Sequence, residues 1–575
     1  SYFPGWKAFL RPMGQPEAVE REVTIYPVNG NFRGVLLPAG DWEVRFRYSP
    51  MTFKLGGLTS AMAGIIILFA FGVWGWRRFY NPDVELTNTR SIAKNSVVPT
   101  VLNLFNKSID FLFAAFYLRV LGPADAGSFA TAVAVAMWYE ILANFGLNTL
   151  IIREVSRDRG ESSRYLLNTL ILRLGTSAVA TLPILAYLAA ASRGANALSG
   201  DTVAAILYLV AGMLFSGAGQ SFAGLFYAYE TAETPAAIAT VTTILKVVFG
   251  VIALLLGYGF VGMAAVSVVV NIITLGILAA AARRVIRFDG PWQVDFGLQR
   301  RMVSQSAPLM INHLLAQIFF FIDVPLMQQI NGEEAVGWYN SAYKWVTAIN
   351  VIPSFFTMAL FPVISRQIGD NLADARRSFR MAVKLMAFIS LPTALVTTLL
   401  AYPLIGVLGG PEFLPHGAIA LQIVIWSIPI GWINSVTNYT LIALGLERVQ
   451  VRAFILGVLV NLVGNLLLLP LYSYRAAAAT TILSEIVLLA IFNVYLQRRM
   501  PDVRWLSLLW RPAVATALMG VAFFAGSLAS PALGILVALP VYFVALWLLG
   551  AVGEEERQIL QALLPAPIAA RLRLT

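Results

Sequence analysis

The stretch Gly122-Pro123-Ala124-Asp125-Ala126-Gly127-Ser128-Phe129 is repeated in outline as Gly332-Glu333-Glu334-Ala335-Val336-Gly337-Trp338-Tyr339. In each copy an apolar segment ends, a short acidic turn follows, and a glycine opens the next apolar segment. The second copy comes six apolar segments after the first, so both would have the same orientation in a membrane, as parallel repeats require. The repeat therefore predicts two six-helix lobes around a central cavity that opens alternately to each side.

Outward from these two stretches, fifteen apolar segments long enough to cross a membrane run from residue 57 to residue 552. The chain is 58% hydrophobic and only 12% charged over 575 residues, which is typical of a polytopic membrane protein and not of a soluble domain. The predicted spans are 57–76, 96–120, 127–150, 165–191, 202–228, 235–257, 260–282, 303–330, 336–360, 380–401, 416–443, 449–470, 475–496, 511–529 and 531–552. The predicted fold class is an all-α polytopic membrane protein with two lobes, in which 14 helices are arranged as six, six and two, with an extra N-terminal membrane helix and a small extracytoplasmic β-domain.

The cations between the spans fall almost entirely on alternate connections, and only Arg119, Arg193 and Arg475 lie on the other set. By the positive-inside rule, the arginine-rich connections and the C-terminus are cytoplasmic. The net charge of +11 is thus interpreted as a topology signal, and nucleic acid is not an expected partner. The predicted divisions are a β-domain fragment at 1–55, a membrane helix at 56–78, a linker at 79–95, a first lobe at 96–282, a connection at 283–302, a second lobe at 303–496, two further helices at 511–552 and a tail at 553–575.

Residues 1–55 have a different sequence pattern from the rest of the chain. The segment Trp42–Tyr48 alternates apolar and polar residues, which is typical of a β-strand. The motifs Tyr2-Phe3-Pro4-Gly5-Trp6-Lys7, Asn31-Phe32-Arg33-Gly34-Val35 and Tyr48-Ser49-Pro50 resemble the extracytoplasmic C-terminal end of YfhO-type membrane proteins. That resemblance implies a β-sandwich followed by a last membrane helix. The arginines Arg77 and Arg78 after the first span place this β-domain outside the cell. The chain opens without an initiator Met or signal peptide, and we interpret it as one piece of a longer polypeptide.

From about Thr87 onward, the chain resembles the Wzx-type polysaccharide-biosynthesis flippases, in the superfamily of lipid II flippases and multidrug and toxin extruders. The motifs that carry this resemblance are Ala93-Lys94-Asn95-Ser96, Tyr117-Leu118-Arg119-Val120-Leu121-Gly122-Pro123, and Asn144-Phe145-Gly146-Leu147-Asn148 before Arg153-Glu154. The resemblance implies a bacterial or archaeal cytoplasmic membrane protein that moves a polyprenyl-diphosphate-linked oligosaccharide from the inner to the outer leaflet. It further implies contact with membrane lipids and suggests glycan polymerases and glycosyltransferases as partners.

Ionisable residues inside the spans are the candidate site residues, because each costs about 2.5 to 3.5 kcal/mol at a helix centre. The cations are Lys107, Arg173, Lys246 and Lys344. Cations at different depths of one cavity would suit a diphosphate, so these four are predicted to bind substrate.

Local pairing is the competing interpretation for several of these cations. Lys107 and Asp110 are three residues apart on one helix face and could form an ion pair. Arg173 is near enough to the interface to extend its side chain to water, and Lys344 could pair with Asp323 in the preceding span. Lys246 has no acid within one helical turn, which favours a cavity position.

Glu140 and Glu485 lie in mid-span without a local partner, so they either bridge to the cations or carry a coupling proton or sodium ion. Coupling to the membrane potential is a third option. Asn434 and Asn438, next to Trp432 and Tyr439, are the candidate sugar contacts, against the usual interpretation of membrane amides as helix-packing residues. Pro308 and Pro325 would break the span 303–330 twice and make it a gate, or they are ordinary membrane prolines.

Three functions remain in competition. A flippase breaks no bond, so it needs no catalytic residue, cofactor or metal, and the lack of cysteine excludes thiolate chemistry. An integral-membrane glycosyltransferase or glycan ligase would present acids on a large outer loop, and the outer loops here are short. A small-molecule or drug exporter of the same superfamily would favour an anionic cavity, whereas this chain places cations in its spans.

Overall fold

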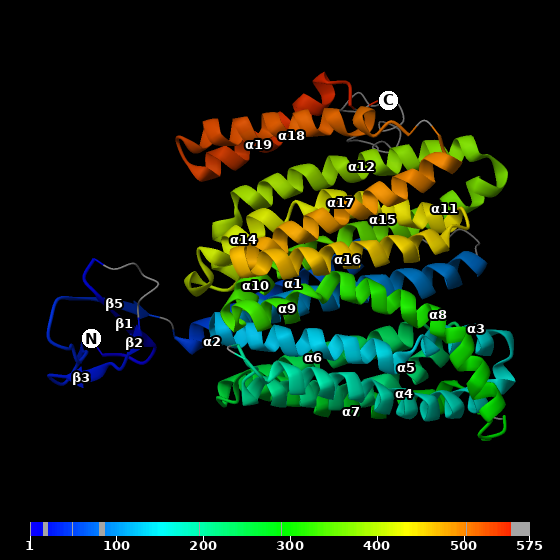
Figure 1. Cartoon of the computed structure of the whole chain (residues 1–575), viewed down its shortest axis with the longest axis horizontal. Helices are drawn as coiled ribbons and strands as arrows, with labels where there is room; N and C mark the ends of the chain where they lie inside the picture. Colours follow the sequence, from blue (N-terminus) through cyan, green and yellow to red (C-terminus); the bar gives the residue numbers. More distant parts are fainter. Residues whose placement is uncertain are drawn as a thin grey trace.

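The computed structural model describes residues 2–14, 21–48, 50–79, 87–194, 196–288, 290–501, 503–551 and 553. A bundle of long helices makes up most of the molecule, and a small sheet region stands at one end of it (Figure 1). The helices are α1 (Met51–Phe79), α2 (Thr87–Asn144), α3 (Leu147–Arg157), η2 (Arg159–Glu161), α4 (Ser162–Ala191), α5 (Gly200–Ala228), α6 (Glu233–Leu255), α7 (Gly259–Val285), α8 (Phe296–Phe321), α9 (Asp323–Asn331), α10 (Glu333–Ile349), α11 (Val351–Asp370), α12 (Leu372–Leu399), α13 (Ala401–Leu408), η3 (Pro411–Phe413), α14 (His416–Val424), α15 (Ser427–Ala443), α16 (Glu447–Tyr472), α17 (Tyr474–Arg499), α18 (Trp505–Ser527) and α19 (Pro531–Leu548).

The sheet region, here called the β-module, confirms the predicted strand at residues 42–48 as β5. Its strands are β1 (Trp6–Pro12), β2 (Arg21–Val23), β3 (Tyr26–Val28), β4 (Phe32–Gly34) and β5 (Trp42–Tyr48). An antiparallel sheet has the order β2-β1-β5, and β3 pairs with β4 in a separate ribbon. The guanidinium of Arg33 lies 3.6 Å from the ring centre of Trp6, and Arg47 reaches η3 through an ion pair of 3.1 Å to Glu412.

The helices follow the predicted spans closely. In the described part of the chain, 12 helices are long and apolar enough to cross a membrane, and the shorter apolar helix Ala532–Leu548 follows them. The first of the 12, Pro99–Arg157, contains both spans predicted at 96–120 and 127–150. They are joined because α2 continues through a kink at Gly122, whose φ of 77° and ψ of 179° interrupt the helical geometry.

Two of the predicted connections are shorter than expected. The linker predicted at 79–95 is helical from Thr87, and its residues 80–86 lie outside the described residues. The connection predicted at 283–302 is reduced because α7 continues to Val285 and α8 begins at Phe296. Beyond residue 553, the predicted tail also lies outside the described residues.

The two repeated stretches meet face to face at the β-module end of the bundle. Gly122 and Gly332 share one backbone conformation, with φ/ψ of 77°/179° and 85°/178°. A methyl group on Gly127 would overlap the carbonyl oxygen of Glu333, and one on Gly337 would overlap the carbonyl oxygen of Pro123. Each glycine thus contacts the other repeat, as a two-fold relation between the repeats requires, and we call this contact the seam.

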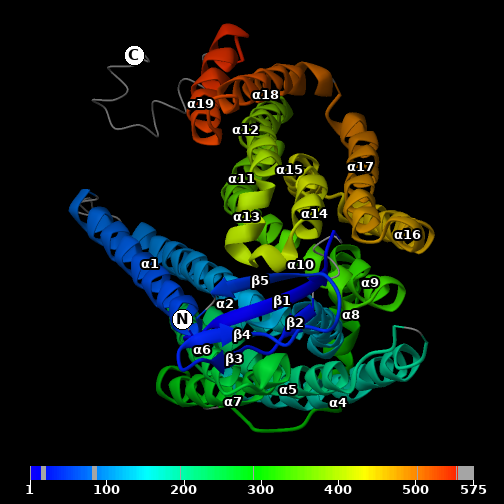
Figure 2. The same ribbon diagram turned by 90° about the vertical axis from the view of Figure 1, so that its left-hand side faces the viewer.

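The seam separates two groups of helices. Helices α4 to α7 lie on one side of α2 and α10, and helices α11 to α19 lie on the other (Figure 2). Helices α18 and α19 pack on each other, and α18 packs on α12.

Three long apolar segments in the second half of the chain are broken in mid-span. The breaks fall between α8 and α9, between α10 and α11, and between α14 and α15. In each case proline is the third residue of the following helix, at Pro325, Pro353 and Pro429. Backbone N–H groups in the first turn of a helix have no intrahelical acceptor, so a proline at this position costs no hydrogen bond. Pro308 lies inside α8, so at this proline the alternative of an ordinary membrane proline applies.

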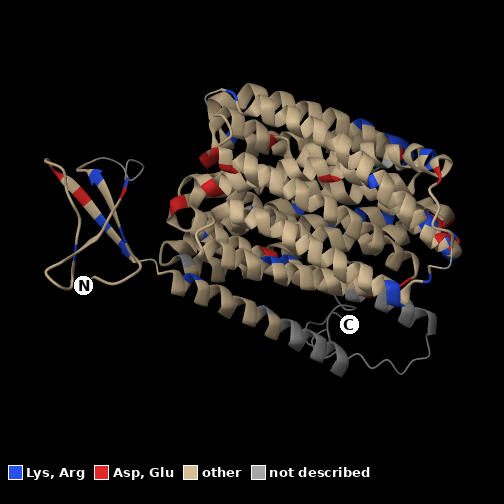
Figure 3. Ribbon diagram, turned by 90° about the horizontal axis from the view of Figure 1, so that it is seen from below, with Lys and Arg blue, Asp and Glu red and all other residues tan. Residues whose placement is uncertain are grey.

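Lys and Arg residues are numerous at the end of the bundle opposite the β-module (Figure 3). This end is called the arginine-rich end below. It carries Arg283 and Arg284 in the last turn of α7, and Arg498 and Arg499 in the last turn of α17. Cations at helix C-termini are stabilised by the helix dipole, so these positions suit both local stability and topology.

Candidate functional site

A buried arginine forms the centre of the candidate site. Arg173 on α4 is only 5% exposed, which corrects the expectation that it extends to water. Its Nη2 donates to Asn144 Oδ1 at 3.0 Å and also to Asn148 Oδ1. Its Nε has no hydrogen-bond partner among the described residues. A guanidinium that is held in place, with a buried donor left over, is suited to bind an additional polar group.

A tight turn between α2 and α3 brings the two asparagines to Arg173. Phe145 and Gly146 both have positive φ, 49° and 73°, and they reverse the chain between Asn144 and Asn148. Both amides also donate to Gln220 Oε1 on α5, at 3.1 Å and 2.6 Å. The turn therefore gathers side chains from α2, α3, α4 and α5 into one polar cluster.

Glu140 completes this cluster. It accepts a hydrogen bond of 2.8 Å from Gln220 Nε2, so a chain of amides links the carboxylate to the guanidinium of Arg173. One positive and one negative charge lie in the same network, which reduces the cost of burying either alone. We call Glu140, Asn144, Asn148, Arg173 and Gln220 the polar cluster.

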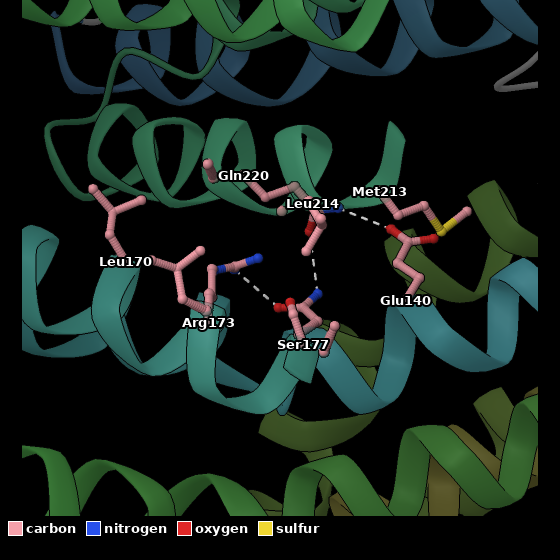
Figure 4. Close-up of a pocket in the computed structure, with 12 residues that line it drawn as sticks. Glu140, Leu170, Arg173, Ser177, Met213, Leu214 and Gln220 are labelled. Atoms are coloured by element: carbon pink, nitrogen blue, oxygen red, sulfur yellow. Dashed lines mark hydrogen bonds between the residues drawn. The ribbon is translucent and has the colours of Figure 1, made fainter. Parts of the chain in front are cut away.

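All members of the polar cluster except Asn148 line a cavity of about 270 Å³, with Ser177, Met213 and Leu214 around it (Figure 4). Gly217 on α5 leaves room for the arginine, because a Cβ there would lie 3.1 Å from Arg173 Nη1. A second cavity of about 480 Å³ shares Gln220 and is lined by further polar side chains, among them Thr242, Thr243 and Asn271. Charged and hydroxyl-bearing ligands both find suitable partners here.

Lys246 pairs with Asp110, and this corrects the ion pair expected between Lys107 and Asp110. The Nζ of Lys246 on α6 lies 3.4 Å from Asp110 Oδ1 on α2, and both side chains are about half exposed. Lys107, on the same helix as Asp110, is exposed. Spacing on one helix predicted the wrong partner because α6 packs against α2 at this level.

Asp323 is buried and bonds to a tyrosine, which corrects the expected pair with Lys344. Tyr339 donates a hydrogen bond of 2.5 Å to Asp323 and also contacts Thr481 Oγ1 at 3.2 Å. Lys344 lies further along α10, half-buried.

Glu485 and Asn434 bond to each other, so the expected sugar contact through Asn434 is corrected. Asn434 Nδ2 donates to Glu485 Oε2 at 2.6 Å and to the Glu485 carbonyl oxygen at 2.8 Å, and both residues are buried. Asn434 therefore joins α15 to α17 as a packing amide. Asn438 is half-buried, and its predicted role stays a prediction.

The sequence reasoning found Arg173 and Glu140 but did not connect them, and it missed Gln220. The signal for Gln220 is a lone amide in the apolar segment Gly212–Gly224 of α5. The signal for the asparagines is their presence on both sides of Phe145-Gly146. Within the described part of the chain, no group of three His, Cys, Asp or Glu is placed to hold a metal ion.

Two protein families match this chain. The polysaccharide biosynthesis protein family matches residues 92–368, and the MatE family matches residues 308–467. The probable low-salt glycan biosynthesis flippase Agl15 of Haloferax volcanii is 22% identical over 404 residues, which is 68% of this chain and 81% of that protein. The uncharacterized membrane protein MJ1068 of Methanocaldococcus jannaschii is 23% identical over 44% of this chain and 51% of that protein.

Solved structures agree with the fold. The lipid II flippase MurJ in its inward closed conformation superposes with a TM-score of 0.63 at 12% identity, over 78% of this chain and 98% of that one. An inward-facing multidrug resistance MATE family transporter superposes with a TM-score of 0.59 at 14% identity, over 72% and 99%. These superpositions show that the chain shares the helical fold of these two structures. Residues 92–368 are similar to the polysaccharide biosynthesis protein family.

Proposed function

We propose that this protein flips a polyprenyl-diphosphate-linked oligosaccharide from the inner to the outer leaflet by alternating access between its two halves. The family match and the glycan flippase among the relatives support this assignment. In the proposed orientation, the arginine-rich end is cytoplasmic and the β-module is extracytoplasmic. The membrane would be the cytoplasmic membrane of a bacterium or archaeon, where glycan polymerases and glycosyltransferases would act on the same lipid.

The observation that carries the proposal is the buried Arg173, which lines a cavity together with Glu140, Asn144 and Gln220. An arginine at the centre of a membrane helix costs about 2.5 to 3.5 kcal/mol, and such residues mark substrate pathways. In our proposal Arg173 binds a phosphate or acidic sugar of the head group, because its planar fork matches such oxyanions. Glu140, Asn144 and Gln220 would accept and donate hydrogen bonds to sugar hydroxyls.

The lysines would extend this path. Lys246 and Lys107 are exposed at mid-span, and Asp110 pairs with Lys246. A diphosphate arriving between the halves could replace that carboxylate. Lys344, on α10 beyond the seam, would contact the diphosphate from the second half.

We assign coupling to the buried carboxylates of the second half. Asp323 and Glu485 are both buried and bond to neutral partners, Tyr339 and Asn434. A buried carboxylate without a cation is stabilised by gaining a proton or sodium ion, and losing that ion on one side would drive the cycle.

A liposome assay tests the proposal. The full chain is reconstituted, and leaflet exchange of a fluorescent undecaprenyl-diphosphate oligosaccharide is followed with and without a membrane potential. We expect exchange above empty liposomes, and about tenfold less for Arg173→Gln, because the head group loses a charge-assisted contact. The matched control is Arg193→Gln, an exposed arginine in the loop after α4, which should exchange as the native protein does.

Two results would contradict the proposal. Exchange at the level of empty liposomes would remove the flippase assignment, and equal exchange by both variants would remove Arg173 from the substrate path. The MatE match raises a second candidate, export of a small molecule. Transport of a fluorescent cationic dye without glycan exchange would favour it.

A further inference from the structure

Four charged side chains join the β-module and α1 to both halves of the bundle near the seam. The carboxylate of Glu412 on η3 pairs with Arg47 of β5 at 3.1 Å. The Nζ of Lys54 on α1 donates to the carbonyl oxygen of Arg119 on α2 at 2.7 Å. We call Arg47, Lys54, Arg119 and Glu412 the clasp.

The first half is held through Lys54. Pro123 has no backbone N–H, so the carbonyl group of Arg119, four residues earlier, loses its usual helical donor. Lys54 supplies a donor in its place, and a cation at the end of a helical segment is also favoured by the helix dipole. Leu58 of α1 is buried, and α1 packs on α2. The start of α1 is therefore attached to the first half beside the seam.

The second half is held through Glu412 and Arg119. Phe413, next to Glu412, is fully buried in the apolar core and anchors η3. Glu412 lies close to the seam, because a Cβ on Gly122 would be 3.4 Å from its Oε2. Arg119 Nη2 donates to the carbonyl oxygen of Val407, in the last turn of α13. Both contacts thus reach the same corner of the second half.

The clasp connects the two halves through a part of the chain that precedes both repeats. Arg47 contacts the second half through η3, and Lys54, a short distance further along the chain, contacts the first half through α2. The glycine contacts of the seam do not need either residue. A contact from this added part to both halves favours the state in which the β-module end is closed, because separating the halves would break it.

We propose that the clasp stabilises the closed state of the β-module end, so that the β-module regulates how often this end opens. The proposal rests on the alternating access of the proposed function and adds a regulator outside the two lobes. The side chains of Arg47 and Glu412 are 26% and 40% exposed. A partly exposed ion pair changes an equilibrium by about two- to fivefold, so the clasp tunes opening and does not lock the protein.

Labelling of a buried seam position tests the clasp without any substrate. Thr131 on α2 is fully buried beside Gln328, so Thr131→Cys reports opening by its reaction with an impermeant maleimide in proteoliposomes. Arg47→Glu brings two carboxylates together, and we expect it to raise labelling by about two- to fivefold. The charge exchange Arg47→Glu/Glu412→Arg should return labelling to the native level.

The matched control is Glu43→Arg, a charge reversal in the same strand. It breaks an ion pair of 2.6 Å with Arg11 inside the β-module, and it should leave labelling unchanged. If Arg47→Glu fails to insert, Glu412→Gln is measured in the same way, since it leaves the β-module intact. Native labelling of the test variant, or an equal rise in the control, overturns the proposal.

Glycan exchange separates this proposal from the proposed function. In Arg47→Cys/Glu412→Cys, a bifunctional maleimide closes the clasp covalently, and we expect exchange to fall about tenfold or more. The control Arg11→Cys/Glu43→Cys, joined within the β-module, should exchange as it does before joining. Unchanged exchange in the joined clasp overturns the proposal. If the native protein shows no exchange, the proposed function fails while the labelling result still decides on the clasp.

Discussion

At the scale of single residues, the candidate site depends on the close approach of a glycine to an arginine. Gly217 faces Arg173 Nη1 at a distance that leaves no room for a larger side chain without displacing the guanidinium. The arginine cannot move freely, because Asn144 and Asn148 hold it. The polar cluster therefore depends on a residue with no functional group of its own.

We expect Gly217→Leu to lower glycan exchange in liposomes by about tenfold or more, because the leucine fills the cavity beside Arg173. The control is Gly175→Leu on α4, where a Cβ meets nothing within 4 Å. Both variants should insert and elute as the native protein does. Native exchange by Gly217→Leu would show that the substrate does not use this cavity.

At the scale of elements, Asp295 links the start of α8 to α4. Its carboxylate caps α8 by accepting from the Leu298 backbone N–H at 2.9 Å, and it pairs with Arg164. The pKa of Asp295 is lowered from its usual value, first by the Leu298 hydrogen bond and then by Arg164. A lowered folded-state pKa gives stability that is present above the unfolded pKa and is lost as the pH falls through the folded value.

We expect Asp295→Ala to lower the unfolding temperature in detergent near neutral pH, because α8 loses the side chain that caps its first turn. Asp295→Asn keeps the cap but loses the carboxylate, so it should destabilise less. The stability of the Asp295→Asn protein should also fall less than that of the native protein when the pH drops below about 4, which is the usual pKa of an aspartate. Thermal scans at neutral and acid pH check both points, and identical acid sensitivity of the native and Asn proteins would contradict them.

At the scale of the whole molecule, the seam fixes how the two halves meet. Gly127 and Gly337 each touch a carbonyl group of the other repeat, and Ser128 donates to Glu333 at 2.8 Å. No side-chain rotation relieves a clash with backbone atoms. Even a methyl group should therefore force the halves apart at the β-module end.

We expect Gly337→Ala to expose the seam in the membrane. The chain has no cysteine, so Thr131→Cys, at a fully buried seam position beside Gln328, can report by labelling with an impermeant maleimide. Labelling should rise severalfold in the Gly337→Ala background and stay low with Gly276→Ala, where nothing lies within 4 Å of a Cβ. Unchanged labelling would mean that the seam does not close this end.

The spans, their alternating charge and the repeat that becomes the seam could all be predicted from the sequence. Those features depend on local composition and on residues near in sequence, and the membrane enforces them. The pairing of side chains was decided by the tertiary structure: Lys246 with Asp110, Glu485 with Asn434, and Arg173 with the amides of α2 and α3. Spacing on one helix fixes which side chains share a face, but only helix packing decides which faces meet, and that is why the charges were found from sequence while their partners were not.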